Sequence, residues 1–186
     1  MRIVAGNHKG ARIAAPKDRR IRPTSDRIRE SVFNILVHGI TGFSLEGARV
    51  LDLFAGTGAL GLEALSRGGS YGVFIDEAPA ARGIIRENIQ NLHLAGKTKI
   101  WRRNACDLGP AGKLIPFDLV FADPPYGRNL GSAALASALD GGWMAPAAVV
   151  VLEEGAGCDI RFPAGISCLD ERRYGATKIL IGQCAA

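Results

Sequence analysis

Mostly apolar segments alternate with amphipathic segments over much of this chain. Short apolar runs predict buried strands, and five such runs occur at residues 48–54, 71–75, 98–102, 117–122 and 147–152. Apolar positions at helical spacing predict helices between them, at about 59–67, 79–92 and 133–139. Strands that alternate with helices and are apolar throughout are typical of a parallel sheet covered on both faces. The pattern therefore predicts an α/β fold.

The N-terminal end does not follow this alternation. Residues 1–23 are basic and contain several glycines and prolines, and short strands or a β-hairpin could form within them. Thr24 or Ser25 can cap a helix that follows. The apolar face of that predicted helix consists of Ile28, Val32, Ile35 and Leu36.

At the C-terminal end, residues 160–162 and 177–181 are predicted as closing strands, with an antiparallel pairing as one arrangement. The Arg-Arg-Tyr-Gly run at 172–175 is predicted as a basic turn before the last strand. We expect a single domain. In it, residues 1–40 form a basic arm with a helix, and residues 41–186 form the core.

Charged residues are distributed unevenly along the chain. The formal net charge is +5, but residues 1–29 contain nine Lys or Arg against two Asp, and the remainder is slightly acidic. A concentrated basic segment suits a polyanion, because each cation near a phosphate releases condensed counterions. The alternative is a solvated basic tail. The candidates for nucleic-acid contact are Lys9, Arg12, Arg22, Arg27 and Arg173.

Other classes of protein are disfavoured. Cys106, Cys158, Cys168 and Cys184 show no C-x-x-C spacing, so free thiols are expected and a zinc site is not. The N-terminus has no apolar signal segment, and no run reaches the roughly 18 apolar residues of a membrane helix. We expect a cytoplasmic, monomeric protein without a metal or a membrane partner.

A glycine-rich turn follows the first predicted core strand. Residues 56–61 match G-x-G-x-x-G, a pattern that also occurs in nicotinamide and flavin dinucleotide sites. Ligands of open α/β sheets bind at the carboxyl ends of strands, and glycine lets the backbone approach them closely. Asp76 lies twenty residues after Gly56, at the end of the second predicted strand. Its carboxylate can accept both ribose hydroxyls of either kind of cofactor.

Asp52 favours S-adenosylmethionine over a dinucleotide. It lies four residues before Gly56, at the end of the first strand. A carboxylate there could interact with a cationic group such as an amino-acid ammonium, whereas it would repel a pyrophosphate. Asn104 and Ala105 follow the third predicted strand and are candidates for contact with the adenine edge. An Asn at such a position is also a common turn former.

The run Asp123-Pro124-Pro125-Tyr126 closes the fourth predicted strand. An exocyclic base amine is a poor nucleophile, because its lone pair is delocalised into the ring. The Asp123 carboxylate and the Pro124 carbonyl can accept its N–H groups and draw it toward a tetrahedral geometry, and the prolines keep the turn stiff. Tyr126 can stack on a base drawn out of its helix or loop. Two carboxylate oxygens suit the adjacent donors of guanine, although adenine stays open.

These motifs resemble the RsmD family of bacterial 16S rRNA guanine-N2 methyltransferases. The runs that carry the resemblance are DLFAGTGALGLEALSRG, DPPY, RPTSDRIRESVFNIL, MRIVAGNHKGARI and RRYGATKILI, and together they cover nearly the whole chain. The resemblance implies a class I S-adenosylmethionine-dependent methyltransferase fold. This Rossmann-like fold has a seven-stranded, mostly parallel sheet whose last strand is antiparallel.

The resemblance also implies roles for individual residues. Catalysis would fall to residues 123–126, the segment 22–24 would lie over the active site, and the basic arm would lie on RNA. The substrate would be the 2-amino group of one guanine of 16S rRNA, in an assembled or partly assembled small subunit. The residues implied at the cofactor are Thr24, Asp52, Phe54, Ala55, Gly56, Gly58, Asp76, Asn104 and Ala105. The short loop at 109–112 departs from the family and could alter contacts with the ribosome.

Three other functions fit part of the sequence. A DNA adenine methyltransferase would share the 123–126 motif, but a chain of 186 residues leaves little room for a separate DNA-reading domain. A nicotinamide-dependent oxidoreductase would use the glycine pattern. An inactive RNA-binding or assembly factor would use the arm, but the intact motif at Asp123 argues against it.

The basic arm supports a first prediction. Neutralising Lys9, Arg12 and Arg22 together should weaken RNA binding and flatten its dependence on salt, because fewer counterions are released. Affinity measured across a series of salt concentrations tests this. An unchanged slope would mean that the arm does not contact RNA.

Overall fold

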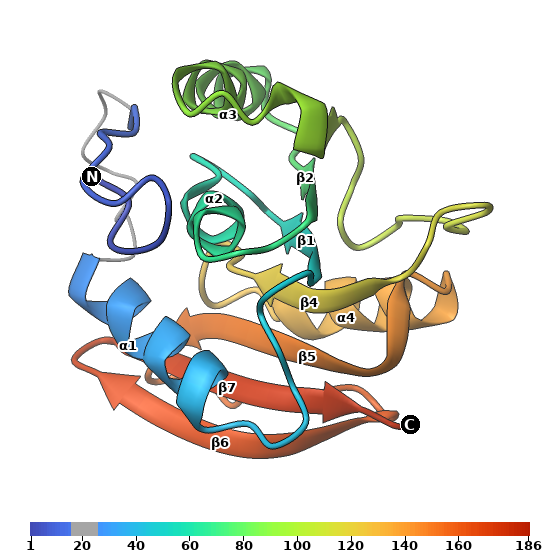
Figure 1. Ribbon diagram of the computed structural model, residues 1–186. Coiled ribbons are helices and arrows are strands. Elements are labelled where there is room, and N and C mark those ends of the chain that lie inside the picture. Colours follow the sequence, from blue (N-terminus) through green and yellow to red (C-terminus); the bar gives the residue numbers. More distant parts are fainter. Residues whose placement is uncertain (16–25) are drawn as a thin grey trace.

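The computed structural model describes residues 1–15 and 26–186 of the chain. Seven strands in these residues form one sheet in the order β3-β2-β1-β4-β5-β7-β6 (Figure 1). Strands β1 to β5 are parallel to one another, and β7 lies antiparallel between β5 and β6. The predicted seven-stranded, mostly parallel sheet is confirmed. The strands are β1 (Arg49–Leu53), β2 (Tyr71–Ile75), β3 (Thr98–Trp101), β4 (Phe117–Ala122), β5 (Met144–Gly155), β6 (Ile166–Tyr174) and β7 (Thr177–Cys184).

Helices cover both faces of the sheet, as predicted. Side chains alternate between the faces of a strand, so Val50 packs with apolar residues of α1 and α2, whereas Leu51 packs with those of α4. Apolar residues of α2 and α3 also pack on Phe74 of β2. Helices α1, α2 and α3 therefore lie on one face, and α4 lies on the other (Figure 1). The helices are α1 (Asp26–His38), α2 (Ala59–Ser66), α3 (Pro79–Asn91) and α4 (Leu130–Asp140), with a short 3-10 helix at Ala95–Lys97.

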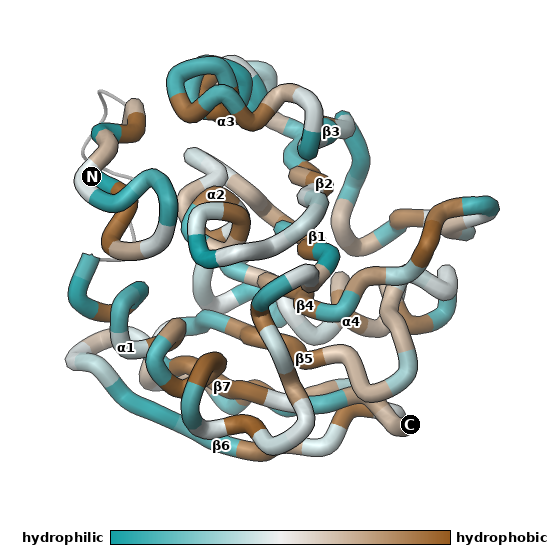
Figure 2. Tube along the Cα trace, viewed as in Figure 1, coloured by the Kyte–Doolittle hydropathy of each residue, from teal (hydrophilic) through white to brown (hydrophobic). Residues whose placement is uncertain are grey.

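The prediction for the C-terminal strands is partly wrong. Residues 160–162 form no strand, and the strand before β7 is β6, which includes Arg172 and Arg173 instead of leaving them in a turn. The turn is the two-residue link Gly175-Ala176, in which Gly175 has φ +61°. Strand β6 lies at the edge of the sheet and most of its side chains are exposed, as its hydrophilic stretch in Figure 2 shows. An exposed edge strand carries no apolar run for the sequence to reveal.

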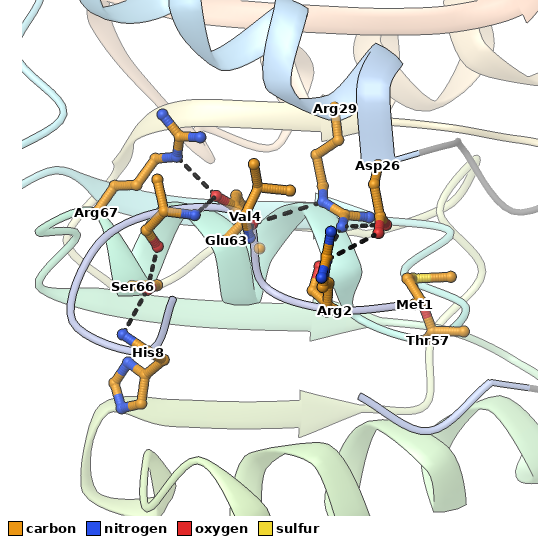
Figure 3. A network of polar contacts seen from close by, with 12 residues as sticks. Met1, Arg2, Val4, His8, Asp26, Arg29, Thr57, Glu63, Ser66 and Arg67 are labelled. Atoms are coloured by element: carbon orange, nitrogen blue, oxygen red, sulfur yellow. Dashed lines mark hydrogen bonds and ion pairs between the residues drawn. The ribbon is translucent and has the colours of Figure 1, made fainter. Parts of the chain in front are cut away.

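The first residues of the chain are docked on the body. Ile3 and Ile13 are buried among side chains of α2 and α3. The fully buried carboxylate of Glu63, in α2, accepts the backbone N–H groups of Val4 at 2.7 Å and Ala5 at 2.9 Å (Figure 3). The described part of the arm is therefore not a solvated tail, and only its outward side chains remain available to a partner.

An ion-pair network joins this docked arm to α1. Arg29 of α1 is fully buried, with its Nε 3.6 Å from Glu63 and its Nη2 2.8 Å from Asp26 (Figure 3). Arg67 donates to the same Glu63 carboxylate at 2.7 Å. A buried charge is costly unless it is paired, and Arg29 and Arg67 pair with Glu63. Through these contacts and its bonds to Val4 and Ala5, Glu63 joins the arm, α1 and α2.

Helix α2 approaches the sheet closely because Gly61 has no side chain. A Cβ atom at Gly61 would lie 2.5 Å from Cε1 of Phe74 and 3.0 Å from Oδ2 of Asp52. Phe74 is fully buried, so its ring cannot turn out into solvent without leaving the core. The third glycine of the 56–61 pattern thus sets the distance between α2 and β2, as in other strand-turn-helix units of this kind.

A Gly61→Ala variant should be less stable by on the order of 1–3 kcal/mol, the usual range for overpacking a core. Gly83→Ala is the matched control, because Gly83 lies in the exposed interior of α3 and a methyl group added there would meet no atom within 4 Å. The control should be slightly more stable, since alanine favours a helix. Chemical denaturation of both variants tests the difference, and equal effects would contradict it.

Candidate functional site

The sheet topology brings the two chemical motifs together. Strands β1 and β4 are neighbours at the position where the order of the chain reverses, which is where open α/β sheets bind ligands. Leu53, at the end of β1, pairs with Ala122, at the end of β4. The glycine turn follows β1, and residues 123–126, the Asp123 turn, follow β4. The two turns therefore leave the same edge of the sheet from adjacent strands.

The glycine turn has a backbone that few residue types adopt. Phe54 has φ +58°, Gly56 +56° and Gly58 +76°. A Cβ atom at Gly56 would meet only the carbonyl oxygen of Phe54, at 3.8 Å, so the backbone there is open to a ligand. Ala55 is buried, and its N–H donates to the carbonyl of Ile75 at 3.0 Å, which attaches the turn to β2. A positive φ at an aromatic residue is uncommon and occurs often at functional sites.

Asp76 faces the glycine turn from the end of β2. Its Oδ2 accepts the N–H of Gly56 at 2.9 Å, and its Oδ1 accepts the N–H of Ala78 at 2.8 Å. A carboxylate has about four acceptor positions, so two remain for ligand hydroxyls. Asp76 thus supports the turn and lies beside it, where the sequence predicted a ribose contact.

Asp52 is more deeply buried than the sequence suggested. Its side chain is 2% exposed, and its Oδ2 accepts the N–H of Gly61 at 3.0 Å. The pKa of Asp52 is raised from 3.8 to about 8, mainly by burial; the Gly61 hydrogen bond opposes this rise, and the charge of Asp76 adds to it. Burial therefore favours the protonated form of Asp52 when no cation lies nearby, and its hydrogen bond to the Gly61 N–H supports the start of α2. The contact with a ligand ammonium stays a prediction.

Asn104 and Ala105 lie after β3, beyond the end of the strand. The side-chain oxygen of Asn104 accepts the N–H of Cys106 at 2.9 Å, so it forms a local turn. The methyl group of Ala105 is 3% exposed and belongs to the core. The Asn104 amide nitrogen and the backbone of this loop can still bind the edge of an adenine ring. The contact with adenine stays a prediction.

The Asp123 turn is held from β5. Pro124 is buried, Asp123 is partly buried, and Tyr126 is 39% exposed. The hydroxyl of Tyr126 donates to Glu153 Oε1 at 2.6 Å, and the N–H of Gly127 donates to Glu154 Oε1 at 2.9 Å. Burial first, and then the bond to Glu153, raise the pKa of the Tyr126 hydroxyl above its ordinary value. Its ring is fixed at the hydroxyl end and half accessible.

Glu153 and Glu154 are not among the site residues predicted from the sequence. Both are buried, at 5% and 1% exposure, in the last part of β5. Their signal is a pair of acidic residues that directly follows the apolar run 147–152. Because proline lacks an N–H, Pro124 and Pro125 cannot anchor the turn by backbone donors, and these carboxylates anchor the residues that follow.

The candidate RNA contacts are partly described. Lys9 and Arg12 are exposed on the arm, and Arg27 is exposed in the first turn of α1. Arg173 is exposed on β6, in a strand and not in the predicted turn. The next residue, Tyr174, has its hydroxyl 2.6 Å from Ser31 Oγ of α1, so this end of β6 lies against α1. Arg22 and Thr24 lie outside the described residues.

The described part of the chain offers no ready site for a metal ion. Residues 1–15 and 26–186 contain no cluster of three or more His, Cys, Asp or Glu side chains that could hold one. The four cysteines are free thiols. Of the described helices, none is long and apolar enough to cross a membrane.

The strand order, the antiparallel β7 and the glycine turn at the switch point define a class I methyltransferase fold, and solved structures agree. The protein yhhF of Escherichia coli superimposes with a TM-score of 0.84 over 100% of this chain and 98% of that one, at 31% identity. HI0767 of Haemophilus influenzae gives a TM-score of 0.80 over 100% and 98%, at 26% identity. The predicted fold class is confirmed.

The chain belongs to the family described as Conserved hypothetical protein 95, whose model matches residues 1–183. A relative named Ribosomal RNA small subunit methyltransferase D, from Escherichia coli K12, is 37% identical over 153 residues, which are 82% of this chain and 74% of that protein. The protein of the same name from Haemophilus influenzae is 29% identical and covers 94% of this chain and 89% of its own length. The resemblance to the RsmD family is confirmed.

The raised pKa of Asp52 supports a prediction about stability. The folded chain keeps the proton to about pH 8, whereas the unfolded chain loses it near 3.8. Because the folded chain holds this proton more tightly, protonation of Asp52 stabilises the folded state. That stabilisation is complete below pH 3.8 and is lost as the pH rises through about 8. Asp52→Asn keeps an acceptor for the Gly61 N–H and cannot ionise.

The Asp52→Asn variant should therefore be more stable than the unsubstituted protein at pH 8, by up to a few kcal/mol. The difference should shrink toward pH 4. Urea unfolding at both pH values, without added ligand, measures it. An advantage that is the same at both pH values would rule out ionisation of Asp52 as the cause.

Proposed function

We propose that this protein transfers the methyl group of S-adenosylmethionine to the 2-amino group of a guanine in 16S rRNA of the small ribosomal subunit. The observation that carries the proposal is the pairing of Leu53 with Ala122, which sets the glycine turn and the Asp123 turn side by side. The names of the relatives point to ribosomal RNA of the small subunit as the substrate.

The residues at the glycine turn fit S-adenosylmethionine. The backbone at Gly56 is open, and Asp76 has acceptor positions left for ribose hydroxyls. The buried Asp52, with its raised pKa, would ionise more readily beside a cationic ammonium, because an opposite charge favours the charged form. When bound, this cofactor would supply an electrophilic methyl group on its sulfonium, and the carbon–sulfur bond would break as the amine nitrogen takes the methyl group and S-adenosylhomocysteine leaves.

The Asp123 turn would prepare the amine. The Asp123 carboxylate and the Pro124 carbonyl would accept its two N–H groups, and Asp123 would be placed to receive the proton that the nitrogen releases after it gains the methyl group. Tyr126 would offer one ring face to the guanine, held in orientation by Glu153. Glu154 keeps the turn against β5 through the Gly127 N–H.

The arm and α1 would contact the RNA backbone. Lys9, Arg12 and Arg27 are exposed cations on segments that the buried Glu63 ties to α2. Because α2 starts at the glycine turn, the arm has a set position relative to the cofactor site. We propose that the enzyme acts as a monomer in the cytoplasm, on an assembled or partly assembled small subunit.

Asp123→Ala should lower methyl transfer on the order of a hundredfold or more, as expected for loss of a group that acts on the reacting amine. Binding of S-adenosylhomocysteine should stay nearly unchanged. Methyl transfer to purified small subunits, with calorimetry for the cofactor product, tests both statements. Asp140→Ala is the matched control, because Asp140 is an exposed carboxylate at the end of α4.

The substrate is tested by offering small subunits and duplex DNA side by side. Mass spectrometry of the product should find 2-methylguanine in 16S rRNA and no methylated DNA. Methylated adenine in the duplex would overturn the RNA assignment. Full turnover by Asp123→Ala would overturn the role of the turn.

A further inference from the structure

Asn88, in α3, has no part in the proposed reaction, but its side chain makes several hydrogen bonds. Its side chain is fully buried. Nδ2 donates to the carbonyl of Thr57 at 2.9 Å and to the carbonyl of Ala14 at 3.1 Å, and Oδ1 accepts the N–H of Ala14 at 2.6 Å. All three partners are backbone atoms of segments that lie far from Asn88 in the sequence.

One of these segments is the glycine turn. Thr57 stands between Gly56 and Gly58, two residues with positive φ and no side chain to restrict them. Besides one bond of its own, from the Gly58 N–H to the Ala55 carbonyl at 2.6 Å, the turn is held by its neighbours. Asp76 binds the Gly56 N–H from β2, and Asn88 binds the Thr57 carbonyl from α3.

The other segment is the arm. Asn88 meets both the N–H and the carbonyl of Ala14, as a neighbouring strand would, directly after the buried Ile13. Lys9 and Arg12, the exposed cations of the arm, precede this contact by a few residues. Asparagine suits the position because one end of its amide accepts while the other end donates twice.

We infer that Asn88 is a positioning residue that joins the RNA-binding arm to the cofactor turn, an inference that rests on the proposed function. Asn88 touches neither ligand, yet the affinities for both depend on it. Loss of its donors releases the Thr57 carbonyl on one side and the Ala14 carbonyl on the other, so the turn and the arm lose their common support.

Asn88→Asp tests this inference. The substitution keeps the size of the side chain and the acceptor for the Ala14 N–H, but it replaces the donor with an oxygen that faces two carbonyls. We expect the dissociation constant of S-adenosylhomocysteine and the KM for small subunits each to rise about tenfold, the effect of one or two lost buried hydrogen bonds. The kcat at saturation should be largely kept, because the Asp123 turn is not touched.

The matched control is Asn91→Asp, the same change three residues further along α3 at an exposed position. It should leave both constants unchanged. A second comparison is the double variant Lys9→Gln, Arg12→Gln, which should raise only the KM for small subunits. If Asn88→Asp does not fold, Asn88→Ala removes the amide donors, together with the acceptor, without adding a charge.

The outcomes separate the inference from the proposed function. Wild-type constants in a folded Asn88 variant would overturn the inference, and so would an increase in only one of them. A fall in kcat with both constants unchanged would also overturn it, because Asn88 would then act on the Asp123 turn. Failure of the proposed function would appear in the unsubstituted protein, as binding of S-adenosylhomocysteine without methylation of small subunits.

Discussion

The pairing of β1 with β4 is the constraint on which the site depends. These strands are neighbours only because the chain reverses its direction of winding between them, and their register aligns Leu53 with Ala122. The glycine turn follows Leu53 and the Asp123 turn follows Ala122, while Asp76 reaches the glycine turn from the end of β2. A shift of the register by one residue would turn the side chains of one strand to the opposite faces. It would also separate the glycine turn from the Asp123 turn.

Both turns are held in part by side chains of neighbouring elements. Phe54, Gly56 and Gly58 of the glycine turn have positive φ, and Asp76 and Asn88 hold the turn from β2 and α3. The Asp123 turn contains two prolines without N–H donors, and Glu153 and Glu154 hold it from β5. The glycine turn also has a hydrogen bond of its own, from the Gly58 N–H to the Ala55 carbonyl at 2.6 Å. In both turns, polar side chains on neighbouring elements act as preorganised supports that leave backbone free to face a ligand.

The N-terminal arm, residues 1–15, is also held by a polar side chain of a neighbouring element. Its basic residues suggested a polyanion partner, and its attachment depends on a carboxylate. Glu63 is fully buried and accepts two backbone N–H groups of the arm, while Arg29 and Arg67 balance its charge (Figure 3). Exposed cations on a flexible tail would have no defined position relative to the cofactor site. On this docked arm, Lys9 and Arg12 keep a set relation to α2, which begins at the glycine turn.

The alternating strands and helices could be predicted from the sequence, because buried parallel strands need continuous apolar runs. The two motifs could be predicted too, because their chemistry needs particular residue types at adjacent positions. The sequence did not reveal β6, whose exposed edge position needs no apolar run, or the deep burial of Asp52. The supports at Glu63, Asn88 and Glu153 were decided only by the tertiary structure. Each lies tens of residues from the backbone or side chain that it holds, and a hydrogen bond between distant segments leaves no periodic mark in the sequence.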